Sequence, residues 1–191
     1  MTTSPKLLAF SGSLRKDSFN QRLVHAAADL ARAAGAQVTV VSLNDFDLPV
    51  FSEDLEAEGT PEGVTRLKAA MKSHHGFIIA CPEYNSSITA ALKNAIDWAT
   101  RPAQGEASLE CFSGKVVGLC AASPGALGGV RGLDHVREIL SNIMCHVVPP
   151  GVAVGGIHEQ FNEDGSLKES RSSMMLTLMC ENAVQLCRGI S

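Results

Sequence analysis

Short, continuous runs of apolar residues alternate along the chain with longer segments in which apolar residues recur every three or four positions. The continuous runs predict buried strands, and the wider spacing predicts helices with one face in the core. The predicted strands cover residues 7–10, 38–41, 77–81, 115–121 and 146–149. The predicted helices cover residues 19–34, 90–100, 133–144 and 166–188, and another follows a long loop over residues 43–59.

The ends of two helices carry typical capping residues. Gly35 is the expected C-cap of the first helix. Thr60 is the expected N-cap of the helix after the long loop, with Pro61 as its first helical residue. In that helix Val64, Leu67 and Met71 would face the core.

The five predicted strands are rich in Val, Ile and Leu and do not alternate with polar residues. This pattern predicts a parallel sheet with helices on both faces, a doubly wound α/β fold. We expect a single domain over residues 1–191. Ligands of such folds bind outside the carboxyl ends of the strands, so the polar or Gly-rich turns after strands one, three and four would converge on one crevice.

Composition narrows the function. The net charge of -4 and the scattered Lys and Arg argue against a nucleic-acid partner. No apolar segment approaches the ~20 residues of a membrane helix, and the N-terminus has no signal-peptide core, so we expect a cytoplasmic protein with no membrane partner. The six Cys and six His residues show no metal-ligand spacing. We therefore expect no metal and buried, reduced thiols.

The turn after the first strand is the strongest chemical signal. It offers hydrogen-bonding side chains from Ser11, Ser13, Ser18 and Asn20. Gly12 lets the backbone come close to a ligand, and the helix start behind it favours an anion. Arg15 adds a permanent charge that can bind phosphate through two hydrogen bonds. These features predict a phosphate site.

The class of phosphate ligand is limited by motifs that the chain lacks. It has no GxxxxGK[ST], which excludes a nucleoside-triphosphate loop, and no GxGxxG after the first strand, which argues against a resident dinucleotide. A phosphoacceptor receiver domain would need carboxylates at the ends of strands one and three, where Phe10-Ser11 and Cys81-Pro82 stand. A terminal monophosphate fits this turn.

The turns after strands three and four would face the same crevice. Pro82, Glu83, Tyr84 and Asn85 begin the first of these turns, and Tyr84 could flank a planar ring. Glu83 could equally make only local hydrogen bonds. The second turn contains Ser123 and several glycines, which permit close backbone approach.

Two of these turns carry a family resemblance. Residues 12–20, GSLRKDSFN, resemble the GSxRxxSxN phosphate loop of the NADPH-dependent FMN reductase family. Residues 82–98, PEYNSSITAALKNAIDW, resemble that family's second motif, PEYNxSxxxxLKNAIDW. The family includes bacterial quinone, chromate and azo-compound reductases. The resemblance implies a flavodoxin-like fold, bound FMN and assembly into homodimers or homotetramers.

By this resemblance, Ser13, Arg15, Ser18 and Asn20 hold the FMN phosphate. Pro82, Glu83, Tyr84 and Asn85 border the flavin ring, and Ser123 lies near its far side. NADPH or NADH would be a transient electron donor, and electrons would pass in ping-pong order through FMN to a small-molecule acceptor. FMN would carry the chemistry, so no catalytic side chain is expected. Two alternatives remain open: an electron carrier of the flavodoxin type and a flavin-binding sensor without turnover.

Overall fold

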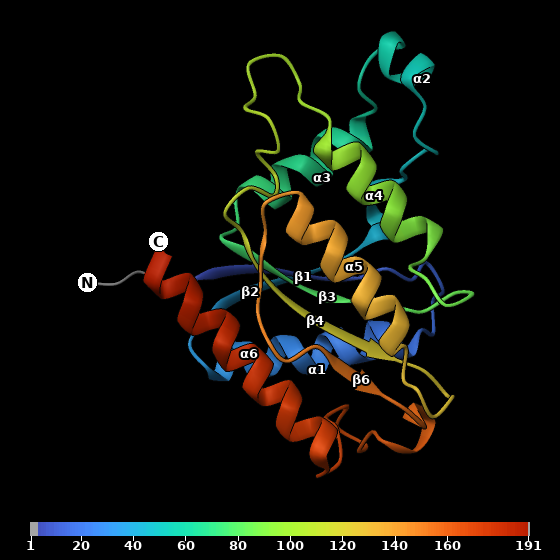
Figure 1. Cartoon of the computed structure of the whole chain (residues 1–191), viewed down its shortest axis with the longest axis vertical. Coiled ribbons are helices and arrows are strands. Elements are labelled where there is room, and N and C mark those ends of the chain that lie inside the picture. Colours follow the sequence, from blue (N-terminus) through green and yellow to red (C-terminus); the bar gives the residue numbers. More distant parts are fainter. Residues whose placement is uncertain (1–3, 191) are drawn as a thin grey trace.

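One parallel sheet runs through the centre of the molecule, with strand order β2-β1-β3-β4-β5 and with β6 also paired to β4 (Figure 1). The computed structural model describes residues 4–190. The strands are β1 (Lys6–Ser11), β2 (Gln37–Ser42), β3 (Gly76–Ala80), β4 (Val116–Ala122), β5 (His146–Val147) and β6 (Val152–Val154). The predicted doubly wound sheet of five parallel strands is confirmed, with the fifth strand in two pieces.

The break in the fifth strand was not predicted. The expected strand over residues 146–149 ends early at Val147, and the pairing along β4 resumes only at Val152. Pro149 and Pro150 stand between the two pieces. Proline has no N–H to donate to a ladder, so two prolines interrupt the pairing.

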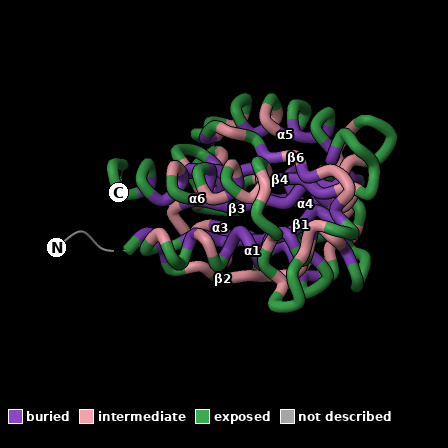
Figure 2. The backbone as a smooth tube through the Cα atoms, turned by 90° about the horizontal axis from the view of Figure 1, so that it is seen from below, coloured by how far each residue is buried: buried purple, intermediate pink, exposed green. Residues whose placement is uncertain are grey.

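Helices cover both faces of the sheet (Figure 1). Helices α1 (Phe19–Ala33) and α6 (Arg171–Ile190) pack on one face, and α3 (Glu62–Lys72), α4 (Ala90–Thr100) and α5 (Val130–Asn142) pack on the other. Side chains of β3 alternate between the two cores, with Ile78 on the α1 side and Phe77 and Ile79 on the other. Strands β3 and β4 are buried along their whole length, whereas the edge strand β2 is half-buried (Figure 2).

The long loop predicted over residues 43–59 contains two short helical elements. They are the 3-10 helix η1 (Leu43–Phe46) and helix α2 (Glu53–Glu58). Ser42 and Asp45 form a capping box around η1, and Ser52 caps α2. Because α2 buries no residue, it has no apolar periodicity by which it could be predicted.

Several predicted helix ends are corrected. Helix α3 begins at Glu62 with Pro61 as its N-cap, not with Thr60 and Pro61 as predicted, because Pro61 has an extended ψ of 145°. Ala34 is the C-cap of α1, and Gly35 follows it with φ +96°. Helix α5 begins three positions earlier than predicted. Helix α4 has the predicted bounds, Ala90–Thr100.

The last helix begins at Arg171 and not at residue 166. Phe161 and Leu167 pair in a short hairpin that takes up the preceding residues. Ser170 and Ser173 then exchange hydrogen bonds between each hydroxyl and the other's N–H, at 3.2 and 2.9 Å, which is the pattern of a capping box. No helix within residues 4–190 is long and apolar enough to cross a bilayer.

Candidate functional site

Three loops meet at the carboxyl edge of the sheet, following β1, β3 and β4. β1 lies between β2 and β3, so the connection after β1 runs toward one edge of the sheet and the connection after β3 toward the other. Such folds bind ligands at this switch point. Backbone hydrogen bonds tie the loops together. The Gly12 N–H donates to the Ala80 carbonyl at the end of β3 over 2.9 Å. The sequence prediction that these turns converge is therefore confirmed for the first and third strands.

The loop after β1, residues 11–18, contains three buried serine hydroxyls. Each accepts a hydrogen bond from a backbone N–H of the loop or helix start: Ser11 Oγ from Ser13, Ser13 Oγ from Arg15 and Ser18 Oγ from Asn20, over 3.1, 3.3 and 3.2 Å. None of the three hydroxyls donates to another residue in the range 4–190. Each proton is thus free to bind an acceptor, and a buried hydroxyl without an acceptor is unfavourable.

Backbone donors and a cation complete this loop, which we call the phosphate loop. The N–H groups of Lys16, Asp17 and Ser18 donate to no other described residue. The Arg15 side chain is exposed, and its guanidinium carbon lies 5.9 Å from the centre of the Phe19 ring. Arg15 forms no ion pair with the residues that the structure describes. Hydroxyls, amides and an unpaired guanidinium form a donor set suited to a phosphate.

The Asn20 side chain has a different setting from the serines. Its Nδ2 donates to the Ala122 carbonyl over 2.8 Å, and its Oδ1 accepts from the Ala122 N–H over 2.9 Å. Both groups are buried. This paired contact fixes the start of α1 to the end of β4, and thus joins the phosphate loop to the third loop of the site.

The loop after β3 makes a tight turn next to the phosphate loop. Tyr84 and Ser87 exchange backbone hydrogen bonds of 2.9 and 3.0 Å, and between them Asn85 and Ser86 have φ of 51° and 64°. Left-handed conformations are unfavourable for residues other than glycine and are often found at ligand sites. Pro82 is buried, and Tyr84 is 55% exposed. The turn therefore presents the phenol ring at the surface.

Glu83 points from this loop toward the start of α5. Its carboxylate accepts hydrogen bonds from the Arg131 N–H over 3.0 Å, the Gly132 N–H over 3.2 Å and the Arg131 Nε over 2.8 Å. Gly129, the N-cap residue of α5, has no side chain to bind these amides, so Glu83 caps the helix from another loop. This contact explains why α5 begins earlier than its sequence predicts.

The carboxylate of Glu83 is held in its charged form. Burial acts to raise the pKa of Glu83, but the hydrogen bonds from Arg131 and Gly132 outweigh burial and keep the pKa below its ordinary value. Glu83 is therefore not a proton donor at neutral pH. The carboxylate makes its hydrogen bonds to the start of α5, and the place of Glu83 beside the flavin ring stays a prediction.

The loop after β4 forms the third side of the site. Ser123 Oγ accepts from the Gly125 N–H over 3.1 Å, and Gly128 and Gly129 have φ of 64° and 92°. A Cβ on Gly129 would lie 2.9 Å from the Cβ of Ala121, so only glycine fits there. This loop and the second loop border a hollow of about 460 Å³, which Glu83, Asn85, Ser123 and Arg131 help to line.

Sequence reasoning missed Thr89, which connects the first two loops. Thr89 is buried and donates from Oγ1 to the Gly12 carbonyl over 2.6 Å. It is also the N-cap of α4. Its position directly before a predicted helix was a signal for capping, but nothing in the sequence indicated the contact with Gly12. Asn44, whose Nδ2 donates to the Leu14 carbonyl over 3.0 Å, was missed as well.

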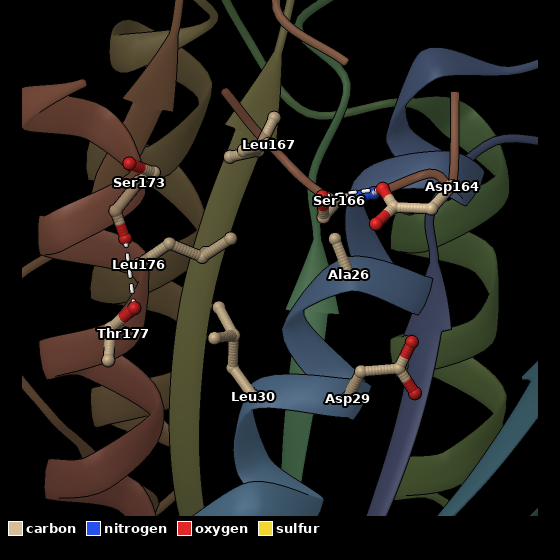
Figure 3. Close-up of a pocket in the computed structure, with 9 residues that line it drawn as sticks. All are labelled: Ala26, Asp29, Leu30, Asp164, Ser166, Leu167, Ser173, Leu176 and Thr177. Carbon is tan, nitrogen blue, oxygen red and sulfur yellow. Dashed lines mark hydrogen bonds between the residues drawn. The ribbon is translucent and has the colours of Figure 1, made fainter. Parts of the chain in front are cut away.

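Another hollow, of about 440 Å³, lies away from these loops between α1, α6 and the hairpin at residues 161–167 (Figure 3). Leu30, Leu167 and Leu176 give it an apolar base. Asp164 accepts a hydrogen bond from the Ser166 hydroxyl, and the Thr177 hydroxyl donates to the Ser173 carbonyl. None of the predicted site residues lines this hollow, so it does not belong to the site.

The six cysteines are buried, as predicted, and none forms a disulfide within residues 4–190. Burial raises the pKa of Cys111 to about 11 and that of Cys145 to about 12, so both are thiols at neutral pH. No group of three His, Cys, Asp or Glu residues in the described part of the chain could hold a metal.

Comparison with known proteins identifies the family. Residues 5–159 match the family described as NADPH-dependent FMN reductase. The chain is 31% identical over 177 residues to an NAD(P)H-dependent FMN reductase of Pseudomonas aeruginosa, covering 92% of this chain and 91% of the relative. It is 34% identical over 160 residues to a quinone reductase of Pseudomonas putida, covering 83% and 82%.

A solved structure agrees in fold. The flavoenzyme NAD(P)H:(acceptor) oxidoreductase FerB of Paracoccus denitrificans superposes with a TM-score of 0.82 and 30% identity, over 97% of this chain and 98% of that chain. The predicted flavodoxin-like fold, the oxidoreductase class and the dependence on FMN and NAD(P)H are confirmed at the level of the family. The chain belongs to the NADPH-dependent FMN reductase family.

Proposed function

We propose that the three loops hold one FMN per chain and that the protein oxidises NAD(P)H with a small acceptor of the quinone type. The observation that carries this proposal is the set of three buried serine hydroxyls in the phosphate loop, which accept backbone hydrogen bonds and donate none to the described residues. Their protons, the loop amides and Arg15 match the acceptor oxygens of a phosphate monoester.

The residues present fit FMN. Ser11, Ser13, Arg15 and Ser18 would hold the phosphate, while Asn20 would act by fixing the loop to β4. The second and third loops would flank the ring. Pro82, Tyr84 and Asn85 would border it on one side and Ser123 on the other, as the family resemblance implies. Glu83 would support this arrangement through α5.

When bound, FMN supplies the two-electron chemistry that links donor and acceptor. The side chains of this protein bind and orient the cofactor. Arg15 and the serine hydroxyls fix the phosphate end, and the strained turn at Asn85 and Ser86 holds Tyr84 at the mouth of the site. Glu83 remains charged and engaged with α5, so it keeps the third loop in place and moves no proton.

The surface near the loops supports a flat, apolar acceptor. Leu14, Tyr84 and Leu127 are large apolar or aromatic side chains that are each more than half exposed, and one comes from each loop. The quinone reductase of Pseudomonas putida suggests the same class of acceptor. We further propose a cytoplasmic, single-domain chain that assembles into homodimers or homotetramers, as the family resemblance implies.

Replacing Arg15 tests the phosphate site. Arg15→Ala should weaken FMN binding by roughly one to two decades, because a hydrogen bond to a charged group contributes about 1.5–3 kcal/mol and each 1.4 kcal/mol is about tenfold. Riboflavin, which has the same ring and no phosphate, should bind almost as before. Isothermal titration of the apoprotein with both flavins measures the ratio.

Arg32→Ala is the matched control, because Arg32 lies in the last turn of α1, at the opposite end of that helix from the phosphate loop. It should leave both affinities unchanged. Equal weakening of the two flavins by Arg15→Ala would mean that Arg15 only orders the loop. No effect on either flavin would remove Arg15 from the site.

Steady-state kinetics separates the enzyme from the two alternatives. If donor and acceptor use the same flavin face in turn, double-reciprocal plots at several acceptor concentrations should be parallel. Intersecting lines would contradict a shared face. A carrier of the flavodoxin type would not oxidise NAD(P)H directly, and a sensor would bind FMN without acceptor-dependent consumption of NAD(P)H.

A further inference from the structure

We propose that Thr89 is a positioning residue for the phosphate loop, so that this side chain on α4 sets the affinity for the FMN phosphate without touching the cofactor. The inference rests on the proposed function of the loop. Thr89 is 2% exposed and stands at the N-cap of α4, outside the residues that the family motif specifies. It belongs to neither the phosphate loop nor the tight turn after β3.

The hydroxyl of Thr89 is engaged on both sides. Oγ1 donates to the Gly12 carbonyl over 2.6 Å and accepts from the Leu92 N–H over 3.1 Å. The second contact is an ordinary helix cap. The first reaches back 77 positions along the chain to the phosphate loop. No other described residue donates to the Gly12 carbonyl, so its direction depends on Thr89.

This contact fixes a whole peptide plane. The N–H that follows the Gly12 carbonyl is that of Ser13, and it donates to Ser11 Oγ over 3.1 Å. Because a trans peptide is planar with its C=O and N–H on opposite sides, Thr89 and Ser11 hold the plane from both edges. Ser13 Oγ in turn accepts from the Arg15 N–H, so the orientation extends to the predicted phosphate ligand Arg15.

Gly12 sets the separation between the loop and α4. A Cβ on Gly12 would lie 2.9 Å from the Cβ of Leu92 and 3.3 Å from Thr89 Oγ1. Real Cβ atoms do not approach other atoms at 2.9 Å, so an alanine here would push the loop away from α4. The loop therefore lies within reach of the Thr89 hydroxyl because residue 12 has no side chain.

Removal of the hydroxyl would leave the buried Gly12 carbonyl without a donor, which is unfavourable. The peptide between Gly12 and Ser13 would then be held only at its N–H, by Ser11 Oγ. Its carbonyl would turn toward another donor, and this would shift Ser13 and Arg15. Thr89→Val keeps the size and β-branching of the side chain. We expect it to weaken FMN about tenfold more than it weakens riboflavin, whereas a merely structural role would weaken both equally.

The experiment measures FMN and riboflavin affinities of the full-length apoprotein by titration. Thr89→Ser restores a hydroxyl and should restore the wild-type ratio of the two affinities. Thr100→Val is the matched control, because Thr100 lies at the other end of α4 and its Oγ1 donates only to the Asp97 carbonyl of the same helix, over 2.8 Å. Thr100→Val should leave the ratio unchanged.

Thr89→Ala, which also removes the hydroxyl and has a smaller side chain, is the second variant if Thr89→Val does not fold. It should also lower the ratio of FMN to riboflavin affinity. An unchanged ratio in both variants, or failure of Thr89→Ser to restore it, would overturn the inference. If Arg15→Ala also leaves the ratio unchanged, the proposed phosphate site itself is wrong. A loss with Arg15→Ala alone rejects only the role of Thr89.

Discussion

The phosphate loop and the outer segments of this protein are fixed by different forces. The outer segments, residues 47–61 and 101–110, lie beyond α3 and α4 at one end of the molecule (Figure 1). The phosphate loop is held by neutral hydrogen bonds between buried groups, among them Thr89 to Gly12 and Asn20 to Ala122. The outer segments also use ion pairs, which join Arg101 to Glu56 and Glu106 to Lys68 and Lys72. Asn94 and Trp98 add neutral hydrogen bonds to Pro49 and Phe51.

The difference follows from what each region has to do. The contacts that hold the phosphate loop are neutral and leave its donors free, and Asp17, the carboxylate of the loop, forms no ion pair with Arg15. No residue of the outer segments is fully buried, and this includes all of α2. Ion pairs hold residues 101–110 to α3 and to α2 instead. Changes in the outer segments should therefore alter stability, and changes in the phosphate loop should alter FMN affinity as well.

The largest expected effect is a loss of stability when the ion pair between Glu106 and Lys68 is broken. Glu106→Gln leaves the buried ammonium group of Lys68 without its counter-ion, and loss of one partner of a buried pair costs about 3–5 kcal/mol. Urea unfolding of the apoprotein should show this loss in the free energy of unfolding. The ratio of FMN to riboflavin affinity should not change.

Asp97→Asn is the control for that variant, because Lys93 and Asp97 form an exposed pair one helical turn apart. Such pairs contribute about 0.3–0.5 kcal/mol. A similar small loss with Glu106→Gln would mean that Lys68 finds water or another acceptor. The ion pairs of Glu106 would then contribute little to the stability of the outer segments.

Acid should weaken the same ion pairs of Glu106. The loss of stability should be smaller than in Glu106→Gln until Glu106 is fully protonated. Hydrogen bonds from Lys68, Lys72 and the Ala103 N–H lower the pKa of Glu106 from 4.5 to about 2. The stability it contributes is therefore complete above pH 4.5 and is lost as pH falls from 4.5 toward about 2. Unfolding free energies of wild type and Glu106→Gln should converge over this range. A constant difference would contradict the assignment.

A smaller loss of stability is expected from the contact that fixes the phosphate loop to β4. Asn20→Ala leaves both backbone groups of the buried Ala122 without partners, which should cost about 1–3 kcal/mol. FMN affinity should fall as well, unlike in Glu106→Gln. Asn182→Ala removes a comparable but exposed hydrogen bond to the Pro149 carbonyl and should change stability by about 0.5 kcal/mol or less. If Asn20→Ala leaves FMN affinity unchanged, the contact between Asn20 and Ala122 does not contribute to the geometry of the phosphate loop.

Much of the fold could be predicted from short sequence patterns. The continuous apolar runs of β3 and β4 are buried on both faces, so their composition alone identifies central parallel strands. Helix α4 had the predicted bounds because its period is clear and Pro102 follows it. Helix α2, the early start of α5 and the break between β5 and β6 were missed, since each depends on exposure, a distant cap or local backbone geometry.

The sequence by itself determined the class of fold, the place of the site at the strand ends and the residue types that suit a phosphate. These depend on local periodicity and on motifs of neighbouring residues. Only the tertiary structure decided that the Asn20 amide binds Ala122, that Glu83 caps α5 and that Thr89 holds Gly12. In each case the two partners are far apart in the chain. A side chain's hydrogen-bonding capacity can be read from its type, but its partner depends on which elements the fold brings together.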